Sequence, residues 1–195
     1  MVLAQGQSQV VMIDADMRRP FLHKIFNLHN RKGLTDTLIH PDLLVNGNLR
    51  QTEIENLSIL TTGDLPPNPS ELIGSDRMVE LVRELEANSD LVLIDTPPVT
   101  AVTDPVILST RVDGVILVLR PGVTKLAAAI HTVEQLKQVG ANLLGVVLND
   151  VENKSNRYYH YYKGYYYTYN KYYEYASESI EDKRSNFLKT LRRDR

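Results

Sequence analysis

Two aspartates and an arginine follow directly on an apolar run near the start of the sequence. Residues 10–13 are all apolar, and Asp14, Asp16 and Arg18 come after them at every second position. An apolar run without polar alternation is typical of a strand buried on both faces, as in a parallel sheet covered by helices. Such sheets bind ligands at the carboxyl ends of their strands. The spacing therefore indicates charged groups at a ligand-binding edge, although a strand that merely ends in a charged loop has the same pattern.

Two further apolar runs end in polar side chains in the same way. Residues 91–94 lead into Asp95, and residues 143–148 lead into Asn149. Carboxylates at such an edge can hold Mg²⁺, usually through water, and can align or deprotonate a hydroxyl, while a cation neutralises phosphate oxygens. A single aspartate can equally cap a helix or shape a turn. Three strand ends together favour a magnesium–nucleotide site over three unrelated turns.

The elements that must position these groups alternate along the chain. Apolar runs predict strands at residues 9–13, 57–61, 91–94, 115–119 and 143–148. Helical spacing predicts helices at residues 21–27, 33–40, 71–87 and 125–139, and the end of another at 2–5. Ser70 or Asn68 is expected to cap the helix at 71–87, after a loop rich in proline. The alternation predicts an α/β fold with a mainly parallel sheet and helices on both faces.

Composition excludes several classes of protein. The net charge of −2 gives no argument for binding nucleic acid or membrane, and the absence of cysteine excludes disulfides and thiolate metal sites. The five histidines share no metal-ligand spacing and are predicted to be surface or packing residues. All 11 tyrosines lie within residues 158–175, so the core must be built mainly from aliphatic side chains. We predict a domain at residues 1–152 and a Tyr-rich and charged tail at 153–195, in which the low-complexity residues 154–175 are disordered.

With these motifs in place, the chain resembles the catalytic domain of a bacterial tyrosine kinase (BY-kinase) of the capsular or exopolysaccharide type. This family is a branch of the MinD/ParA-like P-loop ATPases. Residues 11–18 match its second Walker motif, called A-prime, and residues 91–98 match its Walker B motif. Residues 63–72 match its proline loop, and residues 120–124 a typical turn. The tyrosine cluster completes the resemblance, which covers nearly the whole chain and implies a P-loop NTPase-like fold.

The resemblance implies ATP and Mg²⁺ as cofactors and a role for each residue. Asp14 would lie near magnesium and accept the tyrosine hydroxyl proton, and Asp16 would support this catalytic site. Asp95 would hold magnesium through water. Arg18 would contact phosphate or a neighbouring subunit, and Asn149 would lie near the adenine.

One departure from the family pattern concerns the Walker A loop. Its backbone N–H groups surround the phosphates while a lysine balances their charge. No G-x-x-x-x-G-K-[ST] motif occurs in the 195 residues. We therefore expect an N-terminally truncated kinase domain whose first strand, central and beside the Walker B strand, is missing together with its loop. Such a chain is predicted to bind ATP weakly or not at all.

The tyrosine cluster predicts phospho-acceptors. Residues 154–175 carry four basic side chains and one acidic side chain, a balance of +3, which about two phosphates would reverse. A tail prone to association, or aromatic stacking on single-stranded nucleic acid, would give a similar composition. The resemblance favours phosphorylation and no nucleic-acid partner. The predicted acceptors are Tyr158, Tyr159, Tyr161, Tyr162, Tyr165, Tyr166, Tyr167, Tyr169, Tyr172, Tyr173 and Tyr175.

The resemblance thus implies a cytoplasmic protein-tyrosine autokinase domain that regulates capsular or exopolysaccharide synthesis and export, inactive in this truncated form. Its expected partners are other copies, in a ring-like homo-oligomer with trans-phosphorylation, and a membrane polysaccharide co-polymerase, fused or separate. The co-polymerase would place it at the inner face of the plasma membrane. Two alternatives stay open: a MinD/ParA-like ATPase acting as a positioning switch, and a non-catalytic scaffold or phospho-acceptor.

Overall fold

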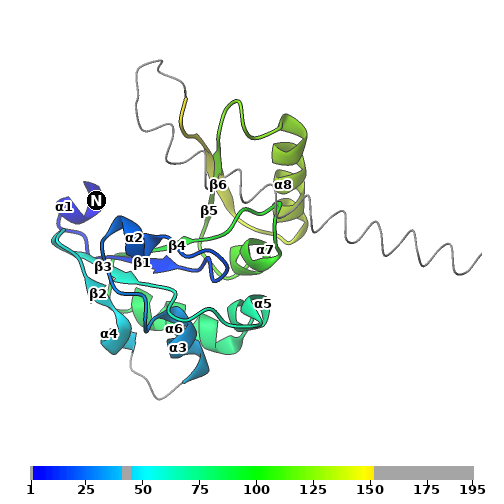
Figure 1. Ribbon diagram of the computed structural model, residues 1–195. Coiled ribbons are helices and arrows are strands. Elements are labelled where there is room, and N and C mark those ends of the chain that lie inside the picture. The colour runs from blue at the N-terminus through cyan, green and yellow to red at the C-terminus, as the bar shows by residue number, and fades with distance from the viewer. Residues whose placement is uncertain (1, 41–44, 152–195) are drawn as a thin grey trace, which may run out of the picture. The chain divides into compact units, whose positions relative to one another are not determined.

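A computed structural model describes residues 2–40 and 45–151 of the chain (Figure 1). A four-stranded sheet has the order β2-β3-β1-β4, in which β1 pairs in parallel with β3 and β4, and the short edge strand β2 is antiparallel to β3. Two further strands, β5 and β6, pair in parallel with each other. The strands are β1 (Val10–Asp14), β2 (Arg50–Gln51), β3 (Leu57–Leu60), β4 (Leu91–Asp95), β5 (Val115–Leu119) and β6 (Leu143–Leu148).

Helices occupy most of the connections between these strands. They are α1 (Val2–Gln5), α2 (Leu22–Ile25), α3 (Leu34–Ile39), α4 (Val45–Asn48), α5 (Pro69–Ile73), α6 (Asp76–Glu86), α7 (Asp104–Ser109) and α8 (Leu126–Gln138). The predicted α/β class with a mainly parallel sheet is confirmed, and the five predicted strands lie within two residues of their predicted bounds.

Strand β1 is covered on both faces, as its unbroken apolar run predicts. Val11 and Ile13 belong to the main core cluster, which also contains side chains of α3, α6 and α7. Val10 belongs to a second cluster together with Ala4 of α1, and Met12 packs against it. Because successive side chains of a strand point to opposite faces, the two clusters lie on opposite faces of β1. This cover fixes the strand whose end carries Asp14.

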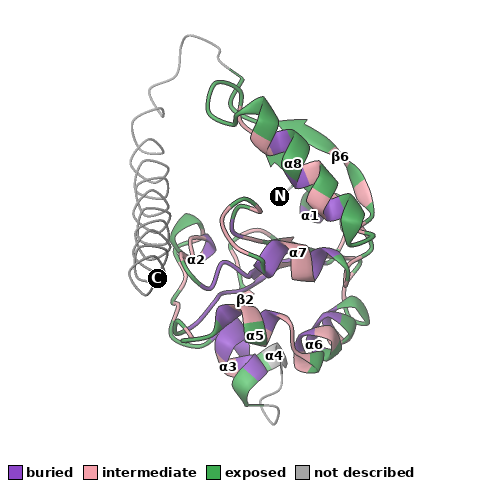
Figure 2. Ribbon diagram, turned by 90° about the vertical axis from the view of Figure 1, so that its right-hand side faces the viewer, coloured by how far each residue is buried: buried purple, intermediate pink, exposed green. Residues whose placement is uncertain are grey.

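Strands β5 and β6 have the same apolar composition but are much less covered. Ile116 and Val118 of β5 are 56% and 57% exposed, and Leu144 of β6 is 65% exposed. Figure 2 shows β6 as a largely exposed strand. Within the described residues, β4 pairs only with β1, so its other edge has no partner strand. Exposed apolar surface of this extent usually marks a place where another segment packs.

The predicted single helix at residues 71–87 is wrong in one respect. The structure has two helices, α5 and α6, separated at Gly74 and Ser75. The Ser75 hydroxyl accepts a hydrogen bond from the Met78 backbone N–H at 3.3 Å and therefore caps α6, in place of the predicted Ser70 or Asn68. The apolar spacing runs through both helices, which is why it predicted one.

Three short elements, α4, β2 and α7, lie in segments where no helix or strand was predicted. The predicted tail at residues 153–195 lies outside the described residues, so the boundary after residue 152 stays a prediction. Among the helices that the structure describes, none is long and apolar enough to cross a membrane.

Candidate functional site

Asp14 and Asp95 end neighbouring strands side by side. In the parallel pairing of β1 with β4, residue 14 is the register partner of residue 95. The backbone N–H of Ala15 continues the ladder and donates to the Asp95 carbonyl oxygen at 2.9 Å. Register partners of a parallel pair point to the same face and lie about one strand spacing apart. The sheet therefore brings two of the predicted carboxylates together at its carboxyl edge.

Asp14 is completely buried, and the described residues form hydrogen bonds to only one of its two carboxylate oxygens. Its Oδ2 accepts hydrogen bonds from the backbone N–H groups of Phe21 and Leu22, both at 2.9 Å. The Thr62 hydroxyl donates to its backbone carbonyl oxygen at 2.8 Å. Its Oδ1 is buried and has no hydrogen-bond partner among the described residues. Burial raises the pKa of Asp14, against the two backbone N–H groups that lower it.

Asp16 shapes the turn after β1. Its Oδ1 accepts hydrogen bonds from the backbone N–H groups of Arg18, at 3.1 Å, and Arg19, at 2.8 Å. An aspartate that binds N–H groups two and three residues ahead fixes a tight turn. Burial raises the pKa of Asp16, while these N–H groups lower it. Asp16 thus holds the loop that follows Asp14, and its predicted support of the catalytic site stays a prediction.

Arg18 is engaged within the chain. Its Nε donates to Asp104 Oδ2 at 3.1 Å, and its Nη2 donates to the Ser70 hydroxyl at 3.1 Å. Ser70 in turn donates to Asp104 Oδ1. Asp104 is the first residue of α7 and is fully buried. The predicted phosphate or subunit contact of Arg18 would have to replace or share these bonds, and it stays a prediction.

Asn149 lies at the end of β6, and the tyrosines lie outside the described residues. Asn149 follows β6 on the second sheet, where its backbone N–H donates to the Leu119 carbonyl oxygen at 2.8 Å. Its predicted place near the adenine stays a prediction. The 11 tyrosines between Tyr158 and Tyr175 lie outside the described residues.

Similarity to known proteins identifies the family of this chain. No family model matches the chain. Tyrosine-protein kinase YwqD of Bacillus subtilis is 38% identical over 161 residues, which cover 83% of this chain and 68% of YwqD. The chain belongs to the bacterial tyrosine-protein kinase family. Tyrosine-protein kinase wzc of Salmonella typhi is 36% identical over 178 residues, 91% of this chain and 24% of wzc. Tyrosine-protein kinase ptk of Acinetobacter johnsonii is 38% identical over 80% of this chain, which spans 21% of ptk.

Solved structures agree with this assignment. The kinase domain of the Escherichia coli tyrosine kinase ETK superposes with a TM-score of 0.75 and is 35% identical, covering 80% of this chain and 60% of that chain. The chimerical protein CapA2B2 gives a TM-score of 0.71 at 40% identity, over 74% of this chain and 64% of that one. MinD of Pyrococcus horikoshii, solved with Mg-ADP, gives 0.63 at 24% identity over 80% of this chain, which shows the shared fold alone. The predicted P-loop NTPase-like fold is confirmed.

The donor atoms at this carboxylate edge fit a magnesium ion. Mg²⁺ prefers oxygen ligands and keeps several of its waters, so one or two carboxylates are enough to hold it. Asp14 Oδ1 is an acceptor without a partner in the described part of the chain, beside a second carboxylate at Asp95. Over residues 2–40 and 45–151 no group of three or more His, Cys, Asp or Glu side chains could form a full protein cage. The donor set thus suits a largely hydrated Mg²⁺.

The raised pKa of Asp95 at this edge of the sheet predicts an unusual pH dependence of the free energy of unfolding. Partial desolvation, and then the charges of Asp14 and Asp16, raise the pKa of Asp95 from 3.8 to about 6. Between pH 4 and 6 the folded state therefore binds more protons than the unfolded state, and the free energy of unfolding falls as pH rises. Since Asp95 is exposed to solvent, we expect a loss of only about 1 kcal/mol.

Urea unfolding of the metal-free chain at pH 4, 5, 6 and 7 measures this slope, and Asp95→Asn should flatten it. A stability that rises between pH 4 and 6 in the unmodified chain would contradict the assignment.

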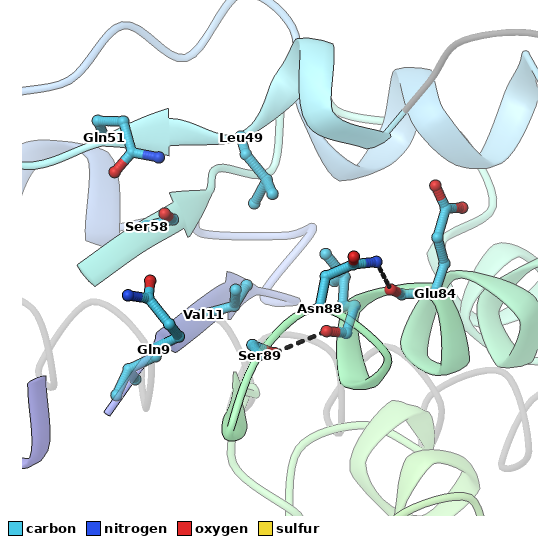
Figure 3. Close-up of a pocket in the computed structure, with 10 residues that line it drawn as sticks. Gln9, Val11, Leu49, Gln51, Ser58, Glu84, Asn88 and Ser89 are labelled. Carbon is cyan, nitrogen blue, oxygen red and sulfur yellow. Dashed lines mark hydrogen bonds between the residues drawn. The ribbon is translucent and has the colours of Figure 1, made fainter. Parts of the chain in front are cut away.

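A small pocket of about 180 Å³ lies away from the carboxylates (Figure 3). It is lined by Gln9, which precedes β1, by Ser58 of β3 and by the end of α6. Its polar side chains near α6 are used to end that helix: Asn88 Nδ2 donates to the Glu84 carbonyl oxygen, and the Ser89 hydroxyl to that of Leu85. The polar side chains that line the pocket near α6 are therefore explained by the end of that helix.

Sequence reasoning missed the side chains that hold the site from a distance. Asp104 and Ser70 bind Arg18 although they lie 86 and 52 residues away in the chain. Thr62 binds the backbone of Asp14 from the end of β3. None belongs to a local pattern with the carboxylates. Only the family's proline loop, which includes Ser70, gave a signal near any of them.

Proposed function

We propose that this chain provides the carboxylate half of the Mg-ATP site of a bacterial protein-tyrosine autokinase. The observation that carries the proposal is the register pairing of Asp14 with Asp95, together with the buried, unpaired Oδ1 of Asp14. Family membership supports transfer of a phosphoryl group to tyrosine. By the same resemblance, the kinase regulates capsular or exopolysaccharide synthesis and export.

Asp14 is the proposed proton acceptor. A tyrosine hydroxyl has a pKa near 10 and needs help to react at neutral pH. The backbone N–H groups of Phe21 and Leu22 hold one oxygen of Asp14 and leave the other free. As the tyrosine oxygen bonds to the γ-phosphorus, the bond from that phosphorus to the ADP oxygen breaks, and the phenolic proton passes to Asp14. Raising the pKa of Asp14 by burial makes its carboxylate a stronger base.

Magnesium would be held at Asp14 and Asp95, in part through water, and would supply positive charge to the phosphate oxygens. Asp16 keeps the loop after β1 in place. We further propose contacts of Arg18 with phosphate or a neighbouring subunit and of Asn149 with adenine. Other copies of the kinase and a membrane polysaccharide co-polymerase are the proposed partners, at the inner face of the plasma membrane.

Because the 195 residues contain no G-x-x-x-x-G-K-[ST] motif, we propose that this chain by itself serves mainly as a phospho-acceptor for an intact kinase. The tyrosines at 158–175 would receive the phosphates. A MinD-like switch that turns over ATP without modifying tyrosine is the second candidate, supported only by the shared fold.

Mass spectrometry of the purified chain separates these functions. With Mg-ATP alone we expect no phosphotyrosine, and with a catalytic amount of intact YwqD we expect phosphates on residues 158–175. A chain whose 11 tyrosines are replaced by phenylalanine is the matched control. Hydrolysis of ATP by the chain alone without phosphotyrosine would favour the switch. No phosphorylation in the presence of active YwqD would contradict the acceptor role.

A further inference from the structure

Residues 18–32, which follow the end of β1, form a strongly basic segment. They contain no aspartate or glutamate, and their basic side chains are Arg18, Arg19, Lys24, Arg31 and Lys32. The basic segment thus carries a charge of +5 in a chain whose net charge is −2. Its charge is a local feature that the average over the whole chain hides.

Three of these side chains carry charge that the described residues do not neutralise. Lys24, Arg31 and Lys32 are exposed, and none of them forms an ion pair within residues 2–40 and 45–151. The buried carboxylates of Asp14 and Asp16 accept hydrogen bonds from backbone N–H groups of the basic segment instead. The exposed charges of the segment are therefore all positive.

The basic segment is held against the sheet near both of its ends. Near its start, two of its backbone N–H groups bind Asp14 at the end of β1. Near its end, Asn30 Nδ2 donates to the Gly63 carbonyl oxygen at 3.1 Å, and Asn30 Oδ1 accepts from the Gly63 N–H at 2.9 Å, beyond the end of β3. Because β1 and β3 are parallel neighbours, the segment crosses the carboxyl edge of the sheet in a defined conformation.

An exposed apolar side chain lies among these charges. Ile25 of α2 is 52% exposed and directly follows Lys24. The Lys24 ammonium lies 5.7 Å from the centroid of the Phe21 ring, so the stem of the lysine has apolar surface beside it. Lysine and arginine can keep their stems on apolar surface and their charges in water. Basic side chains around an exposed apolar one are typical of a segment that rests in the headgroup region of an anionic bilayer.

We propose that the basic segment is a docking surface for a bilayer of anionic phospholipids. Lys24, Arg31 and Lys32 bind lipid phosphates, and Ile25 enters the headgroup region. Because the segment is held to Asp14, docking places the carboxylate edge of the sheet at the bilayer. This inference goes beyond the proposed kinase function, and its test needs neither ATP nor phosphotyrosine.

Single-stranded nucleic acid is the competing polyanion. Its bases stack on exposed aromatic side chains between basic ones. The two aromatic residues of the basic segment, Phe21 and Phe26, are both half-buried, and Phe26 packs against the second core cluster. The exposed apolar side chain is the aliphatic Ile25, which has no flat face for a base. The segment therefore suits a bilayer better than a nucleic acid.

Co-sedimentation of the 195-residue chain with vesicles tests the role of the charges. We expect binding to vesicles of equal parts phosphatidylglycerol and phosphatidylcholine, and none to pure phosphatidylcholine. Raising the salt from about 0.1 M to about 1 M should abolish binding, because the Debye length falls from about 10 Å to about 3 Å. The variant Lys24→Gln/Arg31→Gln/Lys32→Gln should bind roughly a hundredfold more weakly.

The matched control removes three exposed basic side chains elsewhere, in Arg83→Gln/Lys125→Gln/Lys137→Gln. It has the same net charge as the first variant, and we expect its affinity to stay within about twofold of that of the unmodified chain. Equal losses in the two triple variants would mean that only net charge matters and would overturn the proposal, as would unchanged binding by the first variant.

The apolar contact has its own test. Ile25→Ser should weaken binding to the anionic vesicles roughly threefold to tenfold, as expected when about half of an isoleucine side chain leaves water. Leu126→Ser, which changes the 77% exposed Leu126 of α8, should leave binding unchanged. Unchanged binding in Ile25→Ser would refute the insertion of this side chain. Binding of a single-stranded oligodeoxynucleotide, lost in the Lys24 triple variant, together with no binding of vesicles by the unmodified chain, would assign the basic segment to nucleic acid and overturn the proposal.

Discussion

Fusing a strand and a G-x-x-x-x-G-K-[ST] loop ahead of α1 is expected to raise the affinity of the chain for Mg-ATP at least about a hundredfold. Each hydrogen bond from a backbone N–H to a charged phosphate oxygen contributes about 1.5–3 kcal/mol, and the lysine adds its charge. Two such bonds already exceed the roughly 2.7 kcal/mol that a hundredfold change requires. The carboxylates of Asp14 and Asp95 would attract magnesium in the proposed site but repel phosphate by their own charge, so they are not expected to replace this loop.

Isothermal titration calorimetry with a slowly hydrolysed ATP analogue and Mg²⁺ measures the change, with the fused segment taken from YwqD. Replacing the loop lysine by alanine should remove most of the gain and keep the strand. The fused chain should also gain thermal stability before any nucleotide is added, because an added apolar strand can cover exposed side chains such as Ile116 and Val118. Tight, nucleotide-specific binding by the unfused chain would contradict the prediction.

The carboxylate pair could be predicted from the sequence because its cause is local. A wholly apolar strand that ends in aspartate places that aspartate at the carboxyl edge of a parallel sheet, and both β1 and β4 have this form. Which side chains support the pair depends on tertiary packing. Asp104 begins a helix of only six residues, too short to show an apolar period, and it meets Arg18 across 86 positions of the chain.

A local signal also misjudged the helix boundaries of one segment. The apolar spacing of Leu72, Met78 and Leu81 fits one helix, but the hydroxyl of Ser75 caps a second helix and so divides the segment. His23 has no metal-ligand spacing and was predicted to be a surface or packing residue. Its side chain is half-buried in α2, which fits a packing residue.

Replacing Arg18 by alanine is expected to destabilise the fold by about 3 kcal/mol, and more than replacing Asp104 does. Asp104 is fully buried, whereas the Arg18 side chain is 37% exposed. Removing the arginine leaves a buried carboxylate that, among the described residues, keeps the Ser70 hydroxyl and the start of α7. An uncompensated buried charge is costly. Removing the aspartate leaves a guanidinium that can reach water, so Asp104→Ala should cost only about 1–2 kcal/mol.

Urea denaturation of the two single variants and the double variant completes the comparison. Arg18→Ala/Asp104→Ala should be more stable than Arg18→Ala alone, because the second change removes the stranded charge. Ser70→Ala, which keeps the ion pair and loses one hydrogen bond, should cost about 1 kcal/mol. A double variant whose loss is the sum of the two single losses would mean that Arg18 and Asp104 stabilise the chain independently. The ion pair between Arg18, in the loop after β1, and Asp104 of α7 would then contribute nothing to holding the carboxylate site.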